Sequence, residues 1–220
     1  MNYGTDADGR ATLTFNTPSE LDRNWSPAGF DRRHNFQMGF AYQLPWQSSG
    51  SYDGLVQAIV QDWQFNGMFG AFSGTPFTVT GDGTLVNTPS NQQTADLVGT
   101  VKTLGGVGAN QPYFDTSAWA QPTGVRFGTT GRNQFYGPGG WSLDLSMFRS
   151  IALGGTKRLE FRVEGQNFLN HPVFGNPDGG VTSATFMQIS NIPGGAAGNV
   201  GLGNAVYMER NFRLGIRFSF

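Results

Sequence analysis

The segment RLEFRVEGQNFLN, residues 158–170, decides the fold because it has the clearest alternation of apolar and polar residues in the chain. In an extended chain, successive side chains point to opposite faces. One face carries Leu159, Phe161 and Val163, and the other carries Glu160, Arg162 and Glu164. This pattern predicts a strand that separates an apolar environment from water. Its length and its contrast between faces are typical of a transmembrane β-strand.

The C-terminal segment NFRLGIRFSF, residues 211–220, repeats the pattern and ends on an aromatic residue. Its apolar face consists of Phe212, Leu214, Ile216, Phe218 and Phe220. A terminal aromatic residue in phase with such a face resembles the signature by which bacterial outer-membrane barrels are recognised for insertion. We therefore expect these five residues to form a C-terminal insertion signal, with the barrel-assembly machinery as the partner that reads it.

Three further segments alternate in the same way, at residues 35–46, 63–80 and 141–149. The second is interrupted at residues 73–76, SGTP, where proline cannot donate a ladder hydrogen bond. The connections 47–62 and 150–157 are short, whereas 81–140 and 171–209 are long and show no sustained period. Short and long connections alternate, as expected when short turns are periplasmic and long loops are extracellular.

These segments predict an all-β chain, an antiparallel up-and-down segment of a transmembrane β-barrel with long extracellular loops. The same orientation places Trp46, Trp63 and Phe220 at the periplasmic rim and Trp141 at the outer rim. Aromatic residues form girdles at both membrane interfaces of such barrels. We therefore expect the three tryptophans to be girdle residues, and outer-membrane lipid to contact the apolar face.

The composition of the 220 residues excludes several classes of protein. Charged residues make up only 13%, Gly numbers 33 and Phe 19, and the net charge of -1 provides no basic field for nucleic acid. The chain has no Cys, which excludes disulfides and thiolate chemistry. No apolar run is long enough for a membrane-spanning helix. The N-terminus lacks a signal peptide, so an exported protein would require sequence upstream of Met1.

Charged side chains on the polar faces of the predicted strands are the main candidates for chemistry. They are Asp144, Glu160, Arg162, Glu164, Arg213 and Arg217. Paired carboxylates could act in acid–base catalysis, but alternating opposite charges on neighbouring strands favour a cross-strand ladder that faces a watery lumen. His34 and His171 are far apart in sequence, so interfacial or loop roles are favoured over a metal pair. We expect no enzyme activity, cofactor or metal site.

Two other classes of protein share some of these features. A soluble extracellular β-sandwich or carbohydrate-binding module would also have alternating strands, but its apolar faces would meet in a dry core. A secreted hydrolase would need carboxylates that converge in a cleft. Burial of Leu159, Val163, Leu214 and Ile216 inside a globule would favour the sandwich over the membrane protein.

Several motifs, in order and spacing, resemble the C-terminal barrel of Oar-like TonB-dependent outer-membrane proteins. They are FDRRHNF at 30–36, YQLP at 42–45, WQFNG at 63–67, SGTPF at 73–77, GRN at 131–133, GPG at 137–139, FRVE at 161–164, NFLNHP at 167–172, FGNP at 174–177 and LGIRFSF at 214–220. The resemblance covers nearly the whole chain. Each motif alone has little specificity, whereas their shared order is fairly specific.

The resemblance implies a location in the outer membrane of a Gram-negative bacterium and a role in solute uptake. It also implies a large barrel, roughly 22 strands, of which this chain would supply about five to six. In that family an N-terminal plug contacts the TonB complex, and neither the plug nor a preceding N-terminal domain is recognisable in residues 1–220. We therefore expect the chain to be the C-terminal part of such a transporter-like barrel, and the transported solute is not indicated.

Overall fold

A computed structural model describes residues 15, 17–45, 62–86, 93–190 and 209–220. The chain divides into two compact units. The strand unit comprises Asn35–Ala71, Trp141–Pro172 and Tyr207–Phe220. The loop unit comprises Met1–His34, Phe72–Gly140 and Val173–Val206. The chain enters the loop unit after its second and fourth long strands and returns before the third and fifth.

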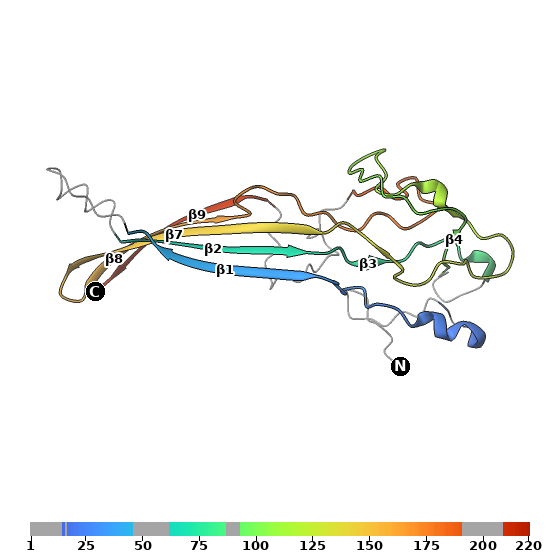
Figure 1. Ribbon diagram of the computed structural model, residues 1–220, viewed down its shortest axis with the longest axis horizontal. Coiled ribbons are helices and arrows are strands. Elements are labelled where there is room, and N and C mark those ends of the chain that lie inside the picture. Colours follow the sequence, from blue (N-terminus) through green and yellow to red (C-terminus); the bar gives the residue numbers. More distant parts are fainter. Residues whose placement is uncertain (1–14, 16, 46–61, 87–92, 191–208) are drawn as a thin grey trace. The chain divides into compact units, whose positions relative to one another are not determined.

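The strand unit is built on one five-stranded sheet with the order β1-β2-β7-β8-β9 (Figure 1). Its strands are β1 (Asn35–Gln43), β2 (Trp63–Phe72), β7 (Gly140–Gly154), β8 (Lys157–Gln166) and β9 (Asn211–Ser219). Long strands that follow one another along the chain are neighbours in the sheet, which is the up-and-down order. β7 and β8 form a hairpin whose turn uses Gly154 and Gly155 at φ 102° and 59°. Positive φ values cost glycine nothing, so the predicted tight turn is present.

The register of β7, β8 and β9 is antiparallel and keeps residues of like character on one face. Val163 of β8 lies opposite Met147 of β7 and Leu214 of β9. Glu164, one residue along, lies opposite Ser146 and Arg213. Because side chains alternate, this register aligns the apolar faces of the three strands and also their polar faces.

Several strand boundaries differ from those expected from the sequence. The range 63–80 is not one strand: β2 ends at Phe72, and β3 (Pro76–Phe77) pairs instead with β6 (Phe135–Tyr136) of the loop unit. The chain leaves β2 at Gly74, where any Cβ would collide with the backbone of Gly137. Proline follows two residues later without an N–H to donate.

The strand expected over residues 158–170 is β8, which ends earlier, at Gln166, because a turn follows it. Asn167 and Asn170 have φ values of 44° and 52°, and the amide of Asn170 donates to the carbonyl of Asn167 over 2.7 Å. Asparagine tolerates this left-handed conformation better than most residues. β7 is longer than the expected 141–149, while β1 and β9 stop within 35–46 and 211–220.

The described parts of the two long connections, which the sequence pattern left without regular structure, are folded in the loop unit. Its short elements include the 3₁₀ helices η1 (Pro18–Asn24), η2 (Thr84–Val86) and η4 (Thr116–Ala118), and a two-stranded sheet of β4 (Asp96–Leu97) and β5 (Trp119–Ala120). Its buried core consists of Phe77, Val79, Ala95, Phe114, Ala118, Trp119, Phe135 and Met187. The indole of Trp119 meets the ring of Phe135 edge to face, with centroids 5.2 Å apart. These apolar residues come from segments widely separated in sequence.

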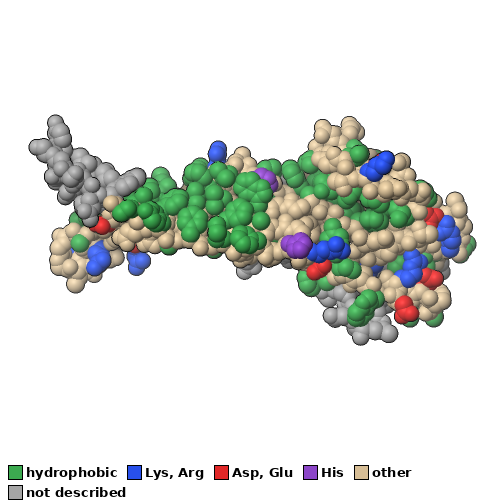
Figure 2. Space-filling view, in the orientation of Figure 1, with side chains coloured by type: hydrophobic (Ala, Val, Ile, Leu, Met, Phe, Trp, Pro, Cys, Tyr) green, Lys and Arg blue, Asp and Glu red, His purple; other side chains and the backbone are tan. Residues whose placement is uncertain are grey.

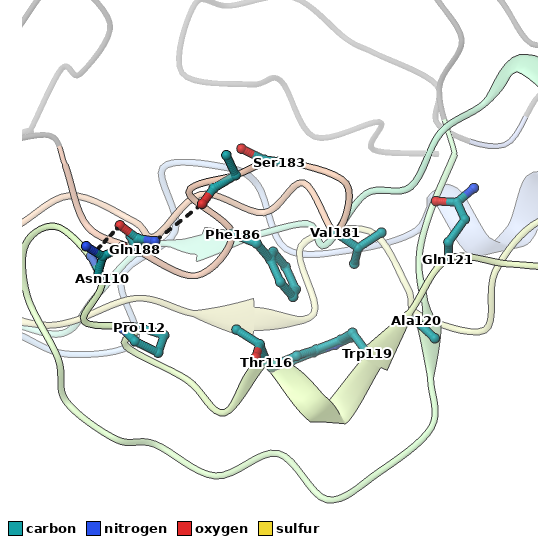
Figure 3. A pocket seen from close by; sticks show the side chains of 11 residues that line it. Asn110, Pro112, Thr116, Trp119, Ala120, Gln121, Val181, Ser183, Phe186 and Gln188 are labelled. Atoms are coloured by element: carbon teal, nitrogen blue, oxygen red, sulfur yellow. Dashed lines mark hydrogen bonds between the residues drawn. The ribbon is translucent and has the colours of Figure 1, made fainter.

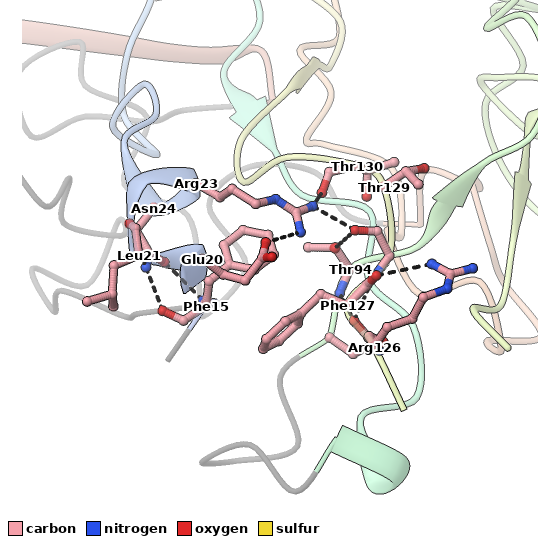
Figure 4. Close-up of polar contacts among 12 residues, drawn as sticks. Phe15, Glu20, Leu21, Arg23, Asn24, Thr94, Arg126, Phe127, Thr129 and Thr130 are labelled. Carbon is pink, nitrogen blue, oxygen red and sulfur yellow. Dashed lines mark hydrogen bonds and ion pairs between the residues drawn. The ribbon is translucent and has the colours of Figure 1, made fainter. Parts of the chain in front are cut away.

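Polar side chains connect the N-terminal segment to the rest of the loop unit (Figure 4). The Arg23 guanidinium donates to the carbonyls of Gly128 and Thr130 over 2.6 and 3.0 Å, and lies 4.0 Å from the centroid of the Phe15 ring. The Asn24 side chain exchanges hydrogen bonds of 2.6 and 3.0 Å with the backbone of Phe15. The buried polar side chain of Asn24 is thus paired with backbone groups.

A bidentate ion pair holds β4 to the segment that follows β5. Arg126 donates to both carboxylate oxygens of Asp96, over 2.8 and 2.6 Å, and the amide of Thr129 donates to the same carboxylate over 3.1 Å. The hydrogen bond from Arg126 is the main cause that lowers the pKa of Asp96 below its usual value. The carboxylate is therefore charged at neutral pH and stabilises this part of the loop unit.

Candidate functional site: the apolar face of the sheet

The candidate functional surface is the apolar face of the five-stranded sheet. It is formed by alternate residues of all five strands, namely Phe36, Met38, Phe40 and Tyr42 of β1, Trp63, Phe65 and Phe69 of β2, Trp141, Leu143, Leu145 and Met147 of β7, Leu159, Phe161 and Val163 of β8, and Phe212, Leu214, Ile216 and Phe218 of β9. Neighbouring rings touch across the strands, as in the Phe40–Phe65 pair at 5.8 Å. In Figure 2 hydrophobic side chains form a continuous patch over the long strands.

Much of this face is exposed among the described residues, although the His171 ring stacks on Trp141 and the Phe168 ring packs against Phe212. Leu214 and Ile216 are 82% and 73% exposed, and Leu159 and Val163 are half-buried. Phe161 lies opposite Ile216, and Phe218 opposite Leu159, on adjacent strands of the same sheet. They do not interdigitate between two sheets, as a β-sandwich would require. A contiguous apolar surface of this extent marks a site that contacts an apolar partner or a membrane.

The opposite face of the sheet is polar and carries most of the charges singled out from the sequence. The register places Glu160 opposite Arg217 and Glu164 opposite Arg213. The Arg162 guanidinium also contacts both glutamates of its own strand, over 3.1 Å to Glu160 and 3.4 Å to Glu164. Exposed pairs of this kind contribute about 0.2–1 kcal/mol each, so the network shapes a polar surface more than it stabilises the sheet.

Asp144 lies in phase with Ser146 on the polar face and holds a neighbouring turn. Its carboxylate accepts a hydrogen bond of 2.8 Å from the amide of Asn167, at the turn where β8 ends. The amide group of Asn167 in turn bonds the backbone N–H and C=O of His171, over 2.9 and 3.1 Å. Asp144 therefore anchors this turn.

Aromatic side chains mark the end of the sheet where β7 begins. The Trp141 indole stacks on the His171 imidazole, with centroids 3.9 Å apart and planes 28° apart, and lies 6.2 Å from the ring of Phe69. Trp63 starts β2 at the other end of the sheet. Trp46 lies outside the described residues. Phe220 follows β9, is 90% exposed, and stacks on Phe218 at 6.0 Å.

Arg149 is a feature of the apolar face that we did not single out from the sequence. It is in phase with Met147 and lies opposite Phe161, yet its side chain is buried. The alternation of β7 in the sequence could have indicated that Arg149 lies on the apolar face. It lies toward the β7–β8 turn, five residues before Gly154.

The described residues contain no group of three or more His, Asp or Glu side chains placed to hold a metal ion. His34 belongs to the loop unit and His171 to the strand unit. None of the helices within the described ranges is both long and apolar enough to cross a membrane.

Comparison with protein families gives an independent assignment. Residues 1–210 match the family model described as an outer membrane beta barrel domain. The chain belongs to this family. No curated protein and no solved structure matches the chain.

Membership of the outer membrane β-barrel domain family places the chain in the outer membrane of a Gram-negative bacterium. The long antiparallel strands supply part of a barrel wall, and the apolar face is the surface of that wall that suits lipid. In the described part of the chain the five strands form an open sheet.

Proposed function

We propose that the chain is part of the wall of an Oar-like, TonB-dependent transporter that takes up a solute across the outer membrane. The observation that supports this proposal best is the exposed apolar face carried by five antiparallel strands in up-and-down order. The motifs that resemble those of Oar-like proteins, and their order along the chain, support the assignment to this transporter group. A complete barrel of that group has roughly 22 strands, so the wall would be closed by strands that this chain does not supply.

In the proposed orientation the loop unit is extracellular, because the long connections of outer-membrane barrels lie outside. The strand ends next to Trp141 then lie at the outer interface, and Trp63 and Phe220 lie at the periplasmic one. The charges of β8 and β9 face the lumen. The proposed partners are outer-membrane lipid, the barrel-assembly machinery, the TonB complex through a plug, and the solute. The chain has no catalytic role in this proposal.

Coupling to TonB can be tested in the full-length protein of the native bacterium. A strain that lacks this gene and a strain that lacks TonB should share a growth defect on the same nutrient, among a panel of single nutrient sources. Photo-crosslinking of the full-length protein should also capture the periplasmic domain of TonB. A protein that stays in the outer membrane but yields no TonB crosslink, with no shared defect, contradicts TonB-dependent uptake and leaves the barrel assignment intact.

A further inference from the structure

The loop unit contains a pocket with a volume of about 540 Å³ between residues 110–121 and 181–188 (Figure 3). This volume is within the range of about 300–1,000 Å³ that small-molecule sites occupy. Hydrogen bonds hold the two segments together. The backbone N–H of Tyr113 donates to the Met187 carbonyl over 2.7 Å, and the backbone N–H of Asn110 donates to the side-chain oxygen of Gln188 over 2.8 Å. The two sides of the pocket are therefore fixed to each other.

The floor of the pocket is apolar and rests on the core of the loop unit. The rings of Phe186 and Trp119 meet edge to face with centroids 6.0 Å apart, and Val181 lies beside them. Trp119 is only 5% exposed, whereas Phe186 is half-buried and offers ring surface to a ligand. An aromatic ring with a rigid support provides contact area at a low cost in entropy.

The rim of the pocket is polar but carries no charge. Its polar groups are side-chain amides and hydroxyls, and none of the lining residues that the structure describes is Asp, Glu, Lys, Arg or His. The side-chain amide of Asn110 and the hydroxyl of Thr116 make no hydrogen bond within the described part of the chain, and both residues are exposed. Amides donate and accept, and so do hydroxyls, which suits a ligand with both kinds of group.

Left-handed backbone conformations occur on both sides of the pocket. Met187 has φ 60° although it is fully buried, and it lies between Phe186 and Gln188. Asn110, on the other side, also has φ 60°. Asparagine tolerates this conformation, whereas it is unfavourable for methionine and persists only where the surrounding structure fixes it. The left-handed conformation of Met187 lies between Phe186 and Gln188, and both of these residues line the pocket.

We propose that this pocket binds a neutral saccharide. A sugar ring has an apolar C–H face that would rest on Phe186, and hydroxyl groups that would pair with the amides and hydroxyls of the rim. A charged ligand would lose its hydration without gaining an opposite charge, and a purely apolar ligand would leave the rim groups unpaired. The inference goes beyond the proposed function, because saccharide binding at this site requires neither TonB coupling nor transport.

The test uses the full-length protein in detergent and isothermal titration with neutral trisaccharides of glucose, galactose, mannose and xylose. Uronic-acid trimers and a neutral tripeptide are titrated in parallel. Asn110→Gly removes the amide group while glycine accepts the positive φ, and Thr116→Val removes a hydroxyl at constant shape. Phe186→Ala removes the ring. The matched control is Val125→Ala, since Val125 is exposed in the loop unit and does not line the pocket.

We expect at least one neutral trisaccharide to bind. Affinity should fall about 3- to 10-fold in Asn110→Gly and in Thr116→Val, the effect of one hydrogen bond, and on the order of tenfold or more in Phe186→Ala. Val125→Ala should bind normally. Hydrogen exchange in residues 113–119 identifies any variant that loses the fold. The proposal is overturned if no neutral saccharide binds at millimolar concentration, if binding ignores the pocket variants, or if the uronic acids or the tripeptide bind in preference.

Discussion

Replacement of Leu214 by arginine tests whether lipid contacts the apolar face. Leu214 is the fourth residue of the nine in β9, so it lies near the middle of a strand that would cross the membrane. Its side chain is 82% exposed, and in water such a site tolerates substitution within about 0.5 kcal/mol. At the midplane of a bilayer, arginine on the lipid face costs about 2–4 kcal/mol. The free energy of unfolding that Leu214→Arg removes should therefore differ clearly between water and lipid.

The matched control is Gly215→Arg, which places the same side chain one residue along, on the polar face. A Cβ at Gly215 would lie 3.8 Å from the Cβ of Arg162, which is an ordinary contact. The like charge of Arg162 should cost at most about 1 kcal/mol. Both variants occupy nearly the same depth, so the difference between them reports the environment of the face.

Urea titration of the full-length protein in phospholipid vesicles measures the free energy of unfolding. Leu214→Arg should reduce the folding equilibrium constant roughly 30- to 700-fold, at tenfold per 1.4 kcal/mol, and Gly215→Arg far less. Equal losses in the two variants, both below about 1 kcal/mol, would refute lipid contact at this face.

Three further changes have expected outcomes. Gly74→Ala should destabilise the loop unit by about 1–3 kcal/mol, because the new Cβ meets backbone that cannot move aside, whereas Gly131→Ala makes only an ordinary contact; hydrogen exchange in the full-length protein compares the two. Because its pKa is lowered in the folded state, Asp96 should stabilise the loop unit fully above about pH 4 and lose this effect as pH falls through the folded pKa. Asp96→Asn should remove that acid sensitivity around Arg126, and unchanged exchange profiles would contradict it. Deletion of Phe220 should sharply reduce outer-membrane insertion with little effect on the described fold, since this side chain is 90% exposed; normal insertion in cell fractionation would count against an insertion signal.

The five long strands could be located from the sequence because their pattern is local. In the segment 158–170, alternation alone assigned Leu159 and Glu160 to opposite faces, and the register places both as expected. The strand ends were less predictable. β2 stops at Phe72 because Gly74 approaches the backbone of Gly137, a residue far away in sequence.

The loop unit could not be derived in the same way. Its core residues follow no period of two or 3.6, so neither a strand nor a helix pattern reveals them. Trp119 packs against Phe135 and Phe186 because of turns and backbone hydrogen bonds between distant segments. The roles of Asp144 and Arg149 were likewise decided by their neighbours in space.

The amino-acid sequence by itself determined which five segments form the long two-faced strands. It also determined that one face of these strands suits a membrane. This was possible because alternation follows from the geometry of a single extended chain. Only the tertiary structure decided the register, the strand ends, the folded core of the long connections and the pocket at Phe186. These features depend on contacts between residues far apart in sequence, and no local pattern encodes such contacts.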